Sequence, residues 1–198
     1  MRLFRSTLTA LALALPLAAP TLGLATSAHA APYTIDNSHT SVLFKTTHLG
    51  VSPFWGRFNN VTGSFQYDAA KVDASKVQFE IDVNSVFTAD KKRDDHLKSP
   101  DFFSAKQFPK ITFESTSVKA GKAAGSLSVT GTLTVRGTKK TITVELAKTG
   151  EGKDPWGGER IGFEGSFVIN RLDYGVSYMP EGLGKDVTIV VAVEGIKG

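Results

Sequence analysis

Three histidines, His39, His48 and His96, are the side chains beyond the N-terminal leader best suited to acid/base chemistry or metal binding. None of them pairs with a second ligand at the spacing of a helical metal site. Structural hydrogen bonding, or hydrogen bonding at the rim of a site, is therefore favoured over metal ligation. The sequence contains no cysteine, which excludes thiol catalysis and cysteine-ligated metals.

His48 differs from the other two, because alternation from Val42 and Phe44 places it on the inward face of a predicted strand. A polar ring inside an apolar interior could hydrogen-bond the carbonyl of a ligand, or act as an acid or base on a lipophilic substrate. An inward histidine can equally be satisfied by the backbone. The sequence leaves these interpretations open.

Two charged clusters could be taken for catalytic machinery: Arg93 with Asp94 and His96, and Arg171 with Asp173. No nucleophile accompanies either cluster. Charges of this kind more often fix a loop by ion pairing, so both clusters are interpreted as rim or loop-fixing groups rather than as ligand contacts. No catalytic residue, metal site or cofactor is predicted.

Strands are the elements that must position these residues. Apolar and polar side chains alternate with period two along most of the chain, and helical periodicity is almost missing. The pattern predicts an all-β domain of eight antiparallel strands. They cover residues 42–48, 55–67, 77–83, 111–118, 127–135, 141–146, 161–169 and 187–193. Short turns between them favour a lipocalin-like up-and-down barrel, whose interior is filled by side chains or holds one slender ligand.

Two other arrangements have a similar strand pattern. A two-sheet sandwich fits the same alternation and stays open, although the length of the first two stretches favours a barrel. An outer-membrane barrel would place its apolar band outside and polar groups inside. Here one face of most strands carries Thr, Ser, Glu or Asp and the other is large and apolar, which favours a water-soluble outside.

The connection over residues 85–107, between the third and fourth predicted strands, is unusually long for a compact domain. A charged stretch in it precedes Phe102 and Phe103. We expect a short helical insertion here, whose Leu97, Phe102 and Phe103 pack against the barrel. The segment is the natural candidate for a lid.

The first residues predict export. Residues 1–5 form a short cationic start, residues 8–24 are almost wholly apolar, and Ala28 and Ala30 flank one variable position as at a signal peptidase site. Pro16, Pro20 and Gly23 interrupt the apolar run, which argues against a membrane anchor. We predict a signal peptide over residues 1–30 and a mature domain over residues 31–198.

The mature domain is expected to be periplasmic or secreted. No cysteine follows the cleavage site, so no lipid anchor is expected. The formal net charge of +4 includes Arg2 and Arg5, which leave with the leader, and the remaining lysines are interleaved with acids. Without a basic stripe, a nucleic-acid partner is not expected.

Four groups of residues follow one another at the spacing found in one known family. The first is Asp36, His39, Val42, Phe44, His48, Leu49, Gly50, Ser52, Gly56 and Phe58. The second is Arg93, Asp94, His96, Leu97, Ser99, Asp101, Phe102, Phe103, Pro109, Ile111 and Phe113. The third is Gly131, Leu133, Thr134, Val135 and Gly137, and the fourth is Asn170, Arg171, Asp173, Tyr174 and Gly175.

On these residues the chain resembles the YceI family of exported lipocalin-like proteins, over residues 33–197. The resemblance implies an eight-stranded barrel whose long apolar cavity takes a polyisoprenoid, such as the chain of ubiquinone, or a fatty amphiphile. It does not imply catalysis. The chain departs from the family at Arg136, where His is common, and at Ser104, where an acid is common, and both departures bear on the polar head group.

The expected function is that of an exported binding protein that holds a polyisoprenoid quinone or fatty-chain lipid for carriage, storage or stress response. The predicted ligand-binding residues are Phe44, His48, Phe54, Trp55, Phe58, Ile81, Val83, Phe87, Leu97, Phe102, Phe103 and Phe113. A barrel enzyme with His48 as its acid/base, or a barrel filled by its own side chains, are the alternatives. Whether two copies form a homodimer is left open.

Overall fold

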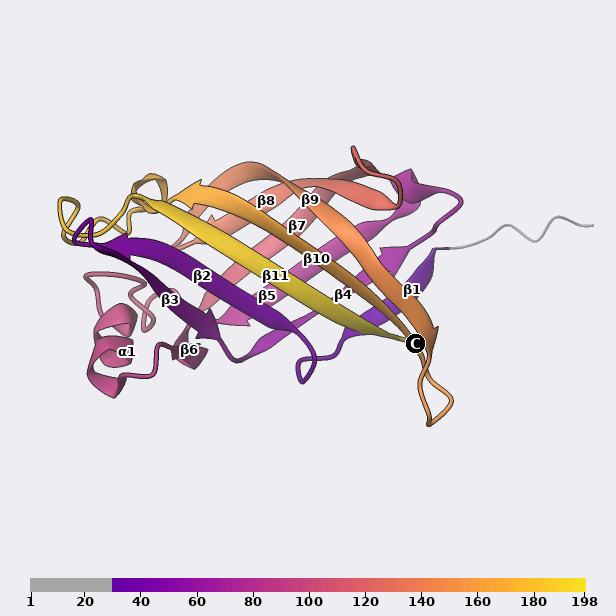
Figure 1. Ribbon diagram of the computed structural model, residues 1–198, viewed down its shortest axis with the longest axis horizontal. Coiled ribbons are helices and arrows are strands. Elements are labelled where there is room, and N and C mark those ends of the chain that lie inside the picture. The colour runs from indigo at the N-terminus through magenta and orange to yellow at the C-terminus, as the bar shows by residue number, and fades with distance from the viewer. Residues whose placement is uncertain (1–29) are drawn as a thin grey trace, which may run out of the picture.

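The computed structural model describes residues 30–198, so the expected signal peptide lies outside the described residues except for Ala30. The described chain is made mainly of antiparallel strands that wrap into an elongated barrel, with a short helix at one end (Figure 1). Within residues 30–198, no helix combines the length and apolarity needed to cross a membrane.

The strands are β1 (Ala31–Ile35), β2 (Ser41–His48), β3 (Ser52–Phe58), β4 (Val61–Tyr67), β5 (Lys76–Asp82), β6 (Val86–Phe87), β7 (Lys110–Ala120), β8 (Ser126–Val135), β9 (Thr138–Lys153), β10 (Glu159–Asn170) and β11 (Asp186–Lys197). The helix is α1 (Lys91–Lys98), and three 3-10 turns are η1 (Val72–Ala74), η2 (Val83–Ser85) and η3 (Arg171–Tyr174).

Pairing between β1 and β11 closes the barrel. The closed ring runs β1-β4-β5-β7-β8-β9-β10-β11, so eight strands surround the interior. β2, β3 and β6 continue the sheet from β11 at one end. This closure confirms the predicted eight-stranded antiparallel barrel, and the sandwich alternative is wrong.

Two places in the barrel wall are shared by consecutive short strands. β1 and β2 lie in succession along β11, opposite its C-terminal and its more N-terminal part. β4 pairs with β1 and β3 pairs with β2, so the strand predicted over residues 55–67 is interrupted at Asn59 and Asn60. Sequence alternation alone does not show such an interruption, because both halves keep the same period.

The apolar face of the strands points inward. In β8 the side chains of Leu127, Val129, Leu133 and Val135 are buried, and the serines and threonines between them are partly exposed. Successive side chains of a strand point to opposite faces, so one face of each strand builds the core. The predicted orientation of the alternating pattern is confirmed.

One end of the barrel is filled with aromatic side chains, and we call it the filled end. Tyr33 stacks on Phe65 with ring centroids 5.0 Å apart, and Phe163 meets Phe65 and Tyr67 edge to face at 5.9 and 5.4 Å. Gly195 of β11 makes room for this packing, because a Cβ there would lie 2.4 Å from the Phe65 ring. The first and last described strands, β1 and β11, pair at this end (Figure 1).

The opposite end carries α1 and the segments that follow it (Figure 1). The Asp90 carboxylate accepts a hydrogen bond from the backbone N–H of Arg93 at 2.9 Å and so caps the helix. The predicted helical insertion between the third and fourth barrel strands is confirmed. It lies at the barrel end where residues 171–185, between β10 and β11, also cross.

Candidate functional site

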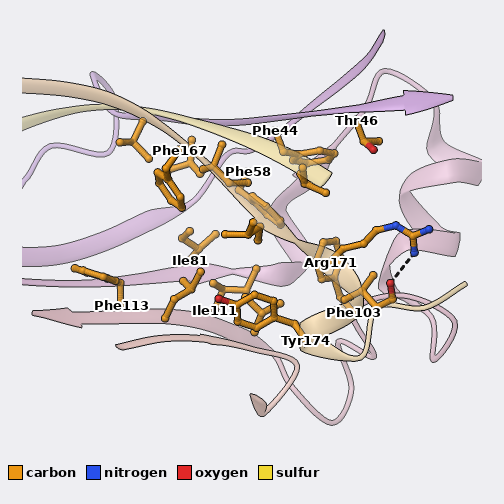
Figure 2. Close-up of a pocket in the computed structure, with 18 of the residues that line it drawn as sticks. Phe44, Thr46, Phe58, Ile81, Phe103, Ile111, Phe113, Phe167, Arg171 and Tyr174 are labelled. Atoms are coloured by element: carbon orange, nitrogen blue, oxygen red, sulfur yellow. Dashed lines mark hydrogen bonds between the residues drawn. The ribbon is translucent and has the colours of Figure 1, made fainter. Parts of the chain in front are cut away.

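An apolar cavity of about 440 Å³ occupies the barrel between the filled end and the end that carries α1. Phenylalanines from five strands line it: Phe79 of β5 together with Phe44, Phe58, Phe113 and Phe167, which are labelled in Figure 2. The other strands contribute mostly Val, Leu and Ile. An apolar space of this size is large enough for the chain of a lipophilic ligand.

The cavity opens to solvent on one side. Of its lining residues, those that are also exposed are His48, Ser52, Pro53, Arg93 and Tyr178. They come from the β2–β3 hairpin, from α1 and from the segment that follows η3. We call this group of five residues the portal.

The connection around α1 forms one wall of the cavity. Leu97, Phe102 and Phe103 all line it, as the sequence predicts for their packing against the barrel. The Phe103 ring packs edge to face on Phe58 with centroids 5.7 Å apart, and Phe102 lies 5.0 Å from the His96 ring. These contacts place the paired phenylalanines between the barrel interior and the surface.

The segment from Arg171 to Lys185 forms a second wall, which the sequence analysis missed. Tyr174, Tyr178 and Leu183 of this segment line the cavity. The available signal was its length, because residues 170–186 separate two predicted strands in the same way as the predicted lid does. Both walls are long connections between strands, but the sequence analysis predicts a wall only for the connection that contains α1.

Arg136 ties the two walls together. Its guanidinium donates one hydrogen bond to the carbonyl of Pro100, at 2.7 Å, and another to the carbonyl of Gly175. This residue is one of the departures from the family pattern, and its place is structural: it joins the segment after α1 to the segment after η3. The other departure, Ser104, is buried with positive φ in the turn that follows Phe103.

Arg171 is buried and holds the second wall in place. Its guanidinium donates hydrogen bonds to the carbonyls of Val176, Leu183, Tyr178 and Gly184 at 2.6 to 3.0 Å, and a longer one to Met179. Figure 2 shows the side chain at the edge of the cavity. Burial lowers the pKa of Arg171. The predicted loop-fixing role fits this geometry, although carbonyls take the place of the expected ion pair.

Asp173 does not share that role. It is exposed, and within residues 30–198 its side chain accepts no hydrogen bond and forms no ion pair. The predicted ion pair between Arg171 and Asp173 is therefore wrong. Sequence proximity suggested the pair, but η3 turns Arg171 inward while Asp173 faces solvent.

Arg93 and Asp94 meet at Thr88. The Arg93 guanidinium donates to the Thr88 hydroxyl at 2.9 Å and to the Thr88 carbonyl at 2.6 Å, and the same hydroxyl donates to buried Asp94 at 2.6 Å. Arg93 also lies over the ring of Phe54, 4.6 Å from its centroid. These contacts fix the start of the wall, in agreement with the loop-fixing interpretation, and Arg93 lines the cavity as well.

Three predicted ligand-binding residues lie elsewhere. Trp55 and Phe87 are about half exposed and point away from the cavity, with Lys45 above the Trp55 ring. Val83 is almost completely buried but does not line the cavity, because the strand ends at Asp82 and Val83 turns into η2. The prediction that these three residues bind the ligand is therefore wrong. Val83 lies beyond the end of β5, where the alternation no longer applies, and Trp55 lies on the outer face of β3. Phe44, His48, Phe54, Phe58, Ile81, Leu97, Phe102, Phe103 and Phe113 line the cavity.

The histidines differ in their surroundings. His48 has the inward parity that the sequence predicts, but it lies at the exposed end of β2, and no described residue hydrogen-bonds to its ring. His96 contacts Asp101, with Nε2 2.8 Å from the carboxylate. An acid/base catalyst is normally oriented by a partner. His48 lacks such a partner among the described residues.

His39 belongs to a polar cluster far from the portal. Its Nδ1 lies 2.8 Å from Asp36 and 3.9 Å from Glu194, a spacing that a metal could also use. The Arg160 guanidinium already bridges Asp36, at 2.7 Å, and Glu194, and it binds Asp154 as well. A cationic side chain therefore fills the place between the two carboxylates.

The Ser38 hydroxyl, His39 and Arg160 together hold the pKa of the Asp36 carboxyl far below its usual range. Each of these groups stabilises the charged form of the carboxyl. The cluster joins the corner between β1 and β2 to β10 and β11. It stabilises the barrel and does not line the cavity.

The sequence is similar to one protein family and to individual members of known sequence. The sequence pattern of the family described as YceI-like domain matches residues 33–195. A "UPF0312 protein" of Shewanella denitrificans is 43% identical over 176 residues, which cover 88% of this chain and 92% of the relative.

Solved structures agree with the fold. BcnA of Burkholderia cenocepacia is 26% identical and aligns with a TM-score of 0.74 over 81% of this chain and 98% of BcnA. A domain of Saccharophagus degradans, described as a polyisoprenoid binding domain implicated in plant cell wall breakdown, is 17% identical. It aligns with a TM-score of 0.62 over 84% of this chain and 98% of that domain, which shows the same fold.

Proposed function

The chain belongs to the YceI-like domain family, and from that premise we propose that it binds an amphiphile with a long apolar chain inside the barrel. The chain of the ligand would be a polyisoprenoid, as in a ubiquinone-type molecule, or a fatty chain. It would lie in the cavity with its polar end at the portal.

The observation that carries this proposal is the hollow, apolar interior open at one side. Each methylene removed from water contributes about 0.8 kcal/mol, so even a short tail offsets much of the cost of ordering it. Close packing is the rule inside proteins, and side chains fill the other end of this barrel. The unfilled space beside that packed region is best explained by a ligand chain.

A solved structure supports the polyisoprenoid class, and the shape of the cavity supports a linear chain. The Saccharophagus degradans domain with the same fold is described as polyisoprenoid binding. The cavity lies along the barrel, because the residues of β11 that line it extend from Val187 to Val193, so a linear chain fits its shape better than a compact ring system. A fatty chain satisfies the same geometry.

Carriage or storage of such a ligand outside the cytoplasm is the role that we propose. Its support is the leader-like sequence of residues 1–30. N-terminal sequencing of the exported protein should then give Ala31 as its first residue. A retained leader, or a protein released only by detergent, would contradict this location.

The alternative of an enzyme with His48 as acid/base is less well supported. Catalysis needs a base that is oriented and a group that stabilises the reacting charge. His48 is exposed at the portal and hydrogen-bonds to none of the described side chains. A binding role needs neither feature.

The proposal is tested with an uncharged fluorescent prenyl alcohol titrated into delipidated protein. Saturable binding at one site per chain is expected, and Ile142→Trp should abolish it, because Ile142 of β9 faces the cavity. Thr141→Trp is the matched control, since Thr141 is the adjacent, outward-facing residue of the same strand. Binding that survives Ile142→Trp, or that no variant changes, would show that the probe binds elsewhere.

A further inference from the structure

The cavity is lined by basic side chains and, in the described chain, by no carboxylates. Four basic groups line it, His48, Arg93, His96 and Arg171, and no Asp or Glu is found among its described lining residues. All four come from the end of the barrel that holds the portal. The polar end of a bound molecule would therefore meet basic groups and the hydroxyls of Ser52 and Tyr178, and no described carboxylate.

One of these four groups has a carboxylate beside it. His96 contacts Asp101, whose carboxylate lies 2.8 Å from its Nε2. Within residues 30–198, no carboxylate comes within salt-bridge distance of His48, Arg93 or Arg171. The nearby acids of α1 are otherwise engaged, Asp94 by the Thr88 hydroxyl and Asp95 by lysines.

Arg93 and Arg171 differ in what they can still bind. Arg171 is buried and directs its guanidinium hydrogen bonds to main-chain carbonyls, so it adds positive charge without a free donor. Arg93 uses Nε and Nη2 on Thr88, while Nη1 has no partner among the described residues. Its guanidinium is held in place over the Phe54 ring at the portal.

We propose that the portal selects amphiphiles with an anionic head, a carboxylate or a phosphate, and that Arg93 contacts that head. This inference rests on the proposed function, because it assigns the head of the ligand whose chain fills the cavity. Arginine offers several N–H donors in one plane, which suits both oxyanions. The buried charge of Arg171 favours an anion at the same end, whereas a neutral oxygen gains less from Arg93 and a cationic head is repelled by both arginines.

The test is a competition series in which chain length is constant and only the head changes. Dodecanoate, dodecanol and dodecylamine compete at pH 8 with the uncharged prenyl probe, and farnesyl phosphate and farnesol form a second pair. We expect each anion to bind about tenfold more tightly than its alcohol, the scale of one hydrogen bond to a charged group. The amine should bind most weakly. The two pairs together distinguish a preference for carboxylate from one for phosphate.

Arg93→Gln should weaken the binding of dodecanoate by a much larger factor than the binding of dodecanol, and so remove the advantage of the anion. Lys92→Gln is the matched control, because Lys92 is an exposed cation on the same helix that does not line the cavity. Added salt should reduce the anion advantage of the wild-type protein, which provides a second readout if Arg93→Gln does not fold.

Three results would overturn the inference. Equal affinity for dodecanoate and dodecanol would contradict a head-group preference while leaving chain binding intact. An anion advantage that survives Arg93→Gln, or disappears equally in Lys92→Gln, would contradict the role of Arg93. If no competitor displaces the probe and the probe itself does not bind, the proposed function fails first, so the two failures are distinguishable.

Discussion

Phe163 and Phe167 lie on the same face of β10, two repeats of the alternation apart, in two different environments. Phe163 is buried in the filled end, where its ring meets Phe65 and Tyr67. Phe167 is only partly buried and faces the cavity (Figure 2). One strand with one apolar face thus serves both a packed core and a hollow site.

The comparison indicates that stability and binding are divided along the barrel. The filled end has the close aromatic packing that stabilises a fold, whereas the cavity end has apolar surface that nothing in the described chain covers. A protein that binds an apolar chain needs both regions, because a uniformly packed barrel has no space and a uniformly hollow one has little core.

Truncation of an aromatic ring should be far more costly at the filled end than beside the cavity. Phe163→Ala should lower the free energy of unfolding by about 3 to 5 kcal/mol, because it leaves a void in a packed region. Phe167→Ala should lower it clearly less, since that ring already borders empty space. Chemical denaturation of the delipidated proteins measures both changes. Equal losses would show that the two ends are packed alike.

Enlargement of a side chain should show the same division. Val83→Trp should cost about 1 to 3 kcal/mol, because Val83 is almost fully buried and does not border the cavity. Ile142→Trp should cost less and should displace the ligand, since the indole has space to enter. Thermal unfolding and probe binding follow the two effects separately. If Ile142→Trp unfolds the protein while Val83→Trp is tolerated, the assignment of the two regions is reversed.

The wall formed by Phe102 and Phe103 should control release of the ligand. Replacement of both by Ala removes the contacts with Phe58 and Tyr178, so the dissociation rate of a bound prenyl probe should rise several-fold. Far-UV circular dichroism should show unchanged strand content, because these residues follow α1 and belong to no strand. Stopped-flow displacement measures the rate. Unchanged release with an intact fold would show that the segment is not a lid.

The smallest effect concerns Asp36, at the corner that joins the filled end to β2. Its pKa is held below its ordinary value of 3.8, so the carboxyl contributes stability above that value and loses the contribution as the pH falls below it. Between about pH 5 and pH 3, the wild-type protein should therefore lose more stability than Asp36→Asn. Asp186→Asn, at an exposed carboxyl without an ion pair in the described chain, is the control. Parallel pH profiles for the wild type and Asp36→Asn would contradict the role of the cluster.

The sequence predicted the barrel and much of the cavity, because both follow from alternation. Period two places Phe44, Phe58 and Phe113 on the inner face, and the structure agrees. Alternation does not show where a strand ends or how deep an inward residue lies. His48 therefore has the predicted parity but lies at the exposed end of its strand, and Val83 falls just beyond the end of its own.

Hydrogen bonds between segments that are distant in the chain could not be predicted from the sequence. Arg171 was paired with nearby Asp173, but its partners are carbonyls up to thirteen residues away, brought back by the loop. The hydrogen bonds from Arg136 to Pro100 and Gly175 likewise join segments that lie far apart in the chain. Such contacts depend on the closed fold and leave no local pattern.

Native mass spectrometry of the protein purified from its own host would show whether the barrel carries a ligand. We expect a mass above that of the polypeptide, and organic extraction should release an amphiphile with a prenyl or fatty chain in about one copy per protein. Ile142→Trp should be isolated without it and Thr141→Trp with it. A wild-type protein that carries no such molecule, and that binds none when prenyl or fatty amphiphiles are supplied, would contradict the account.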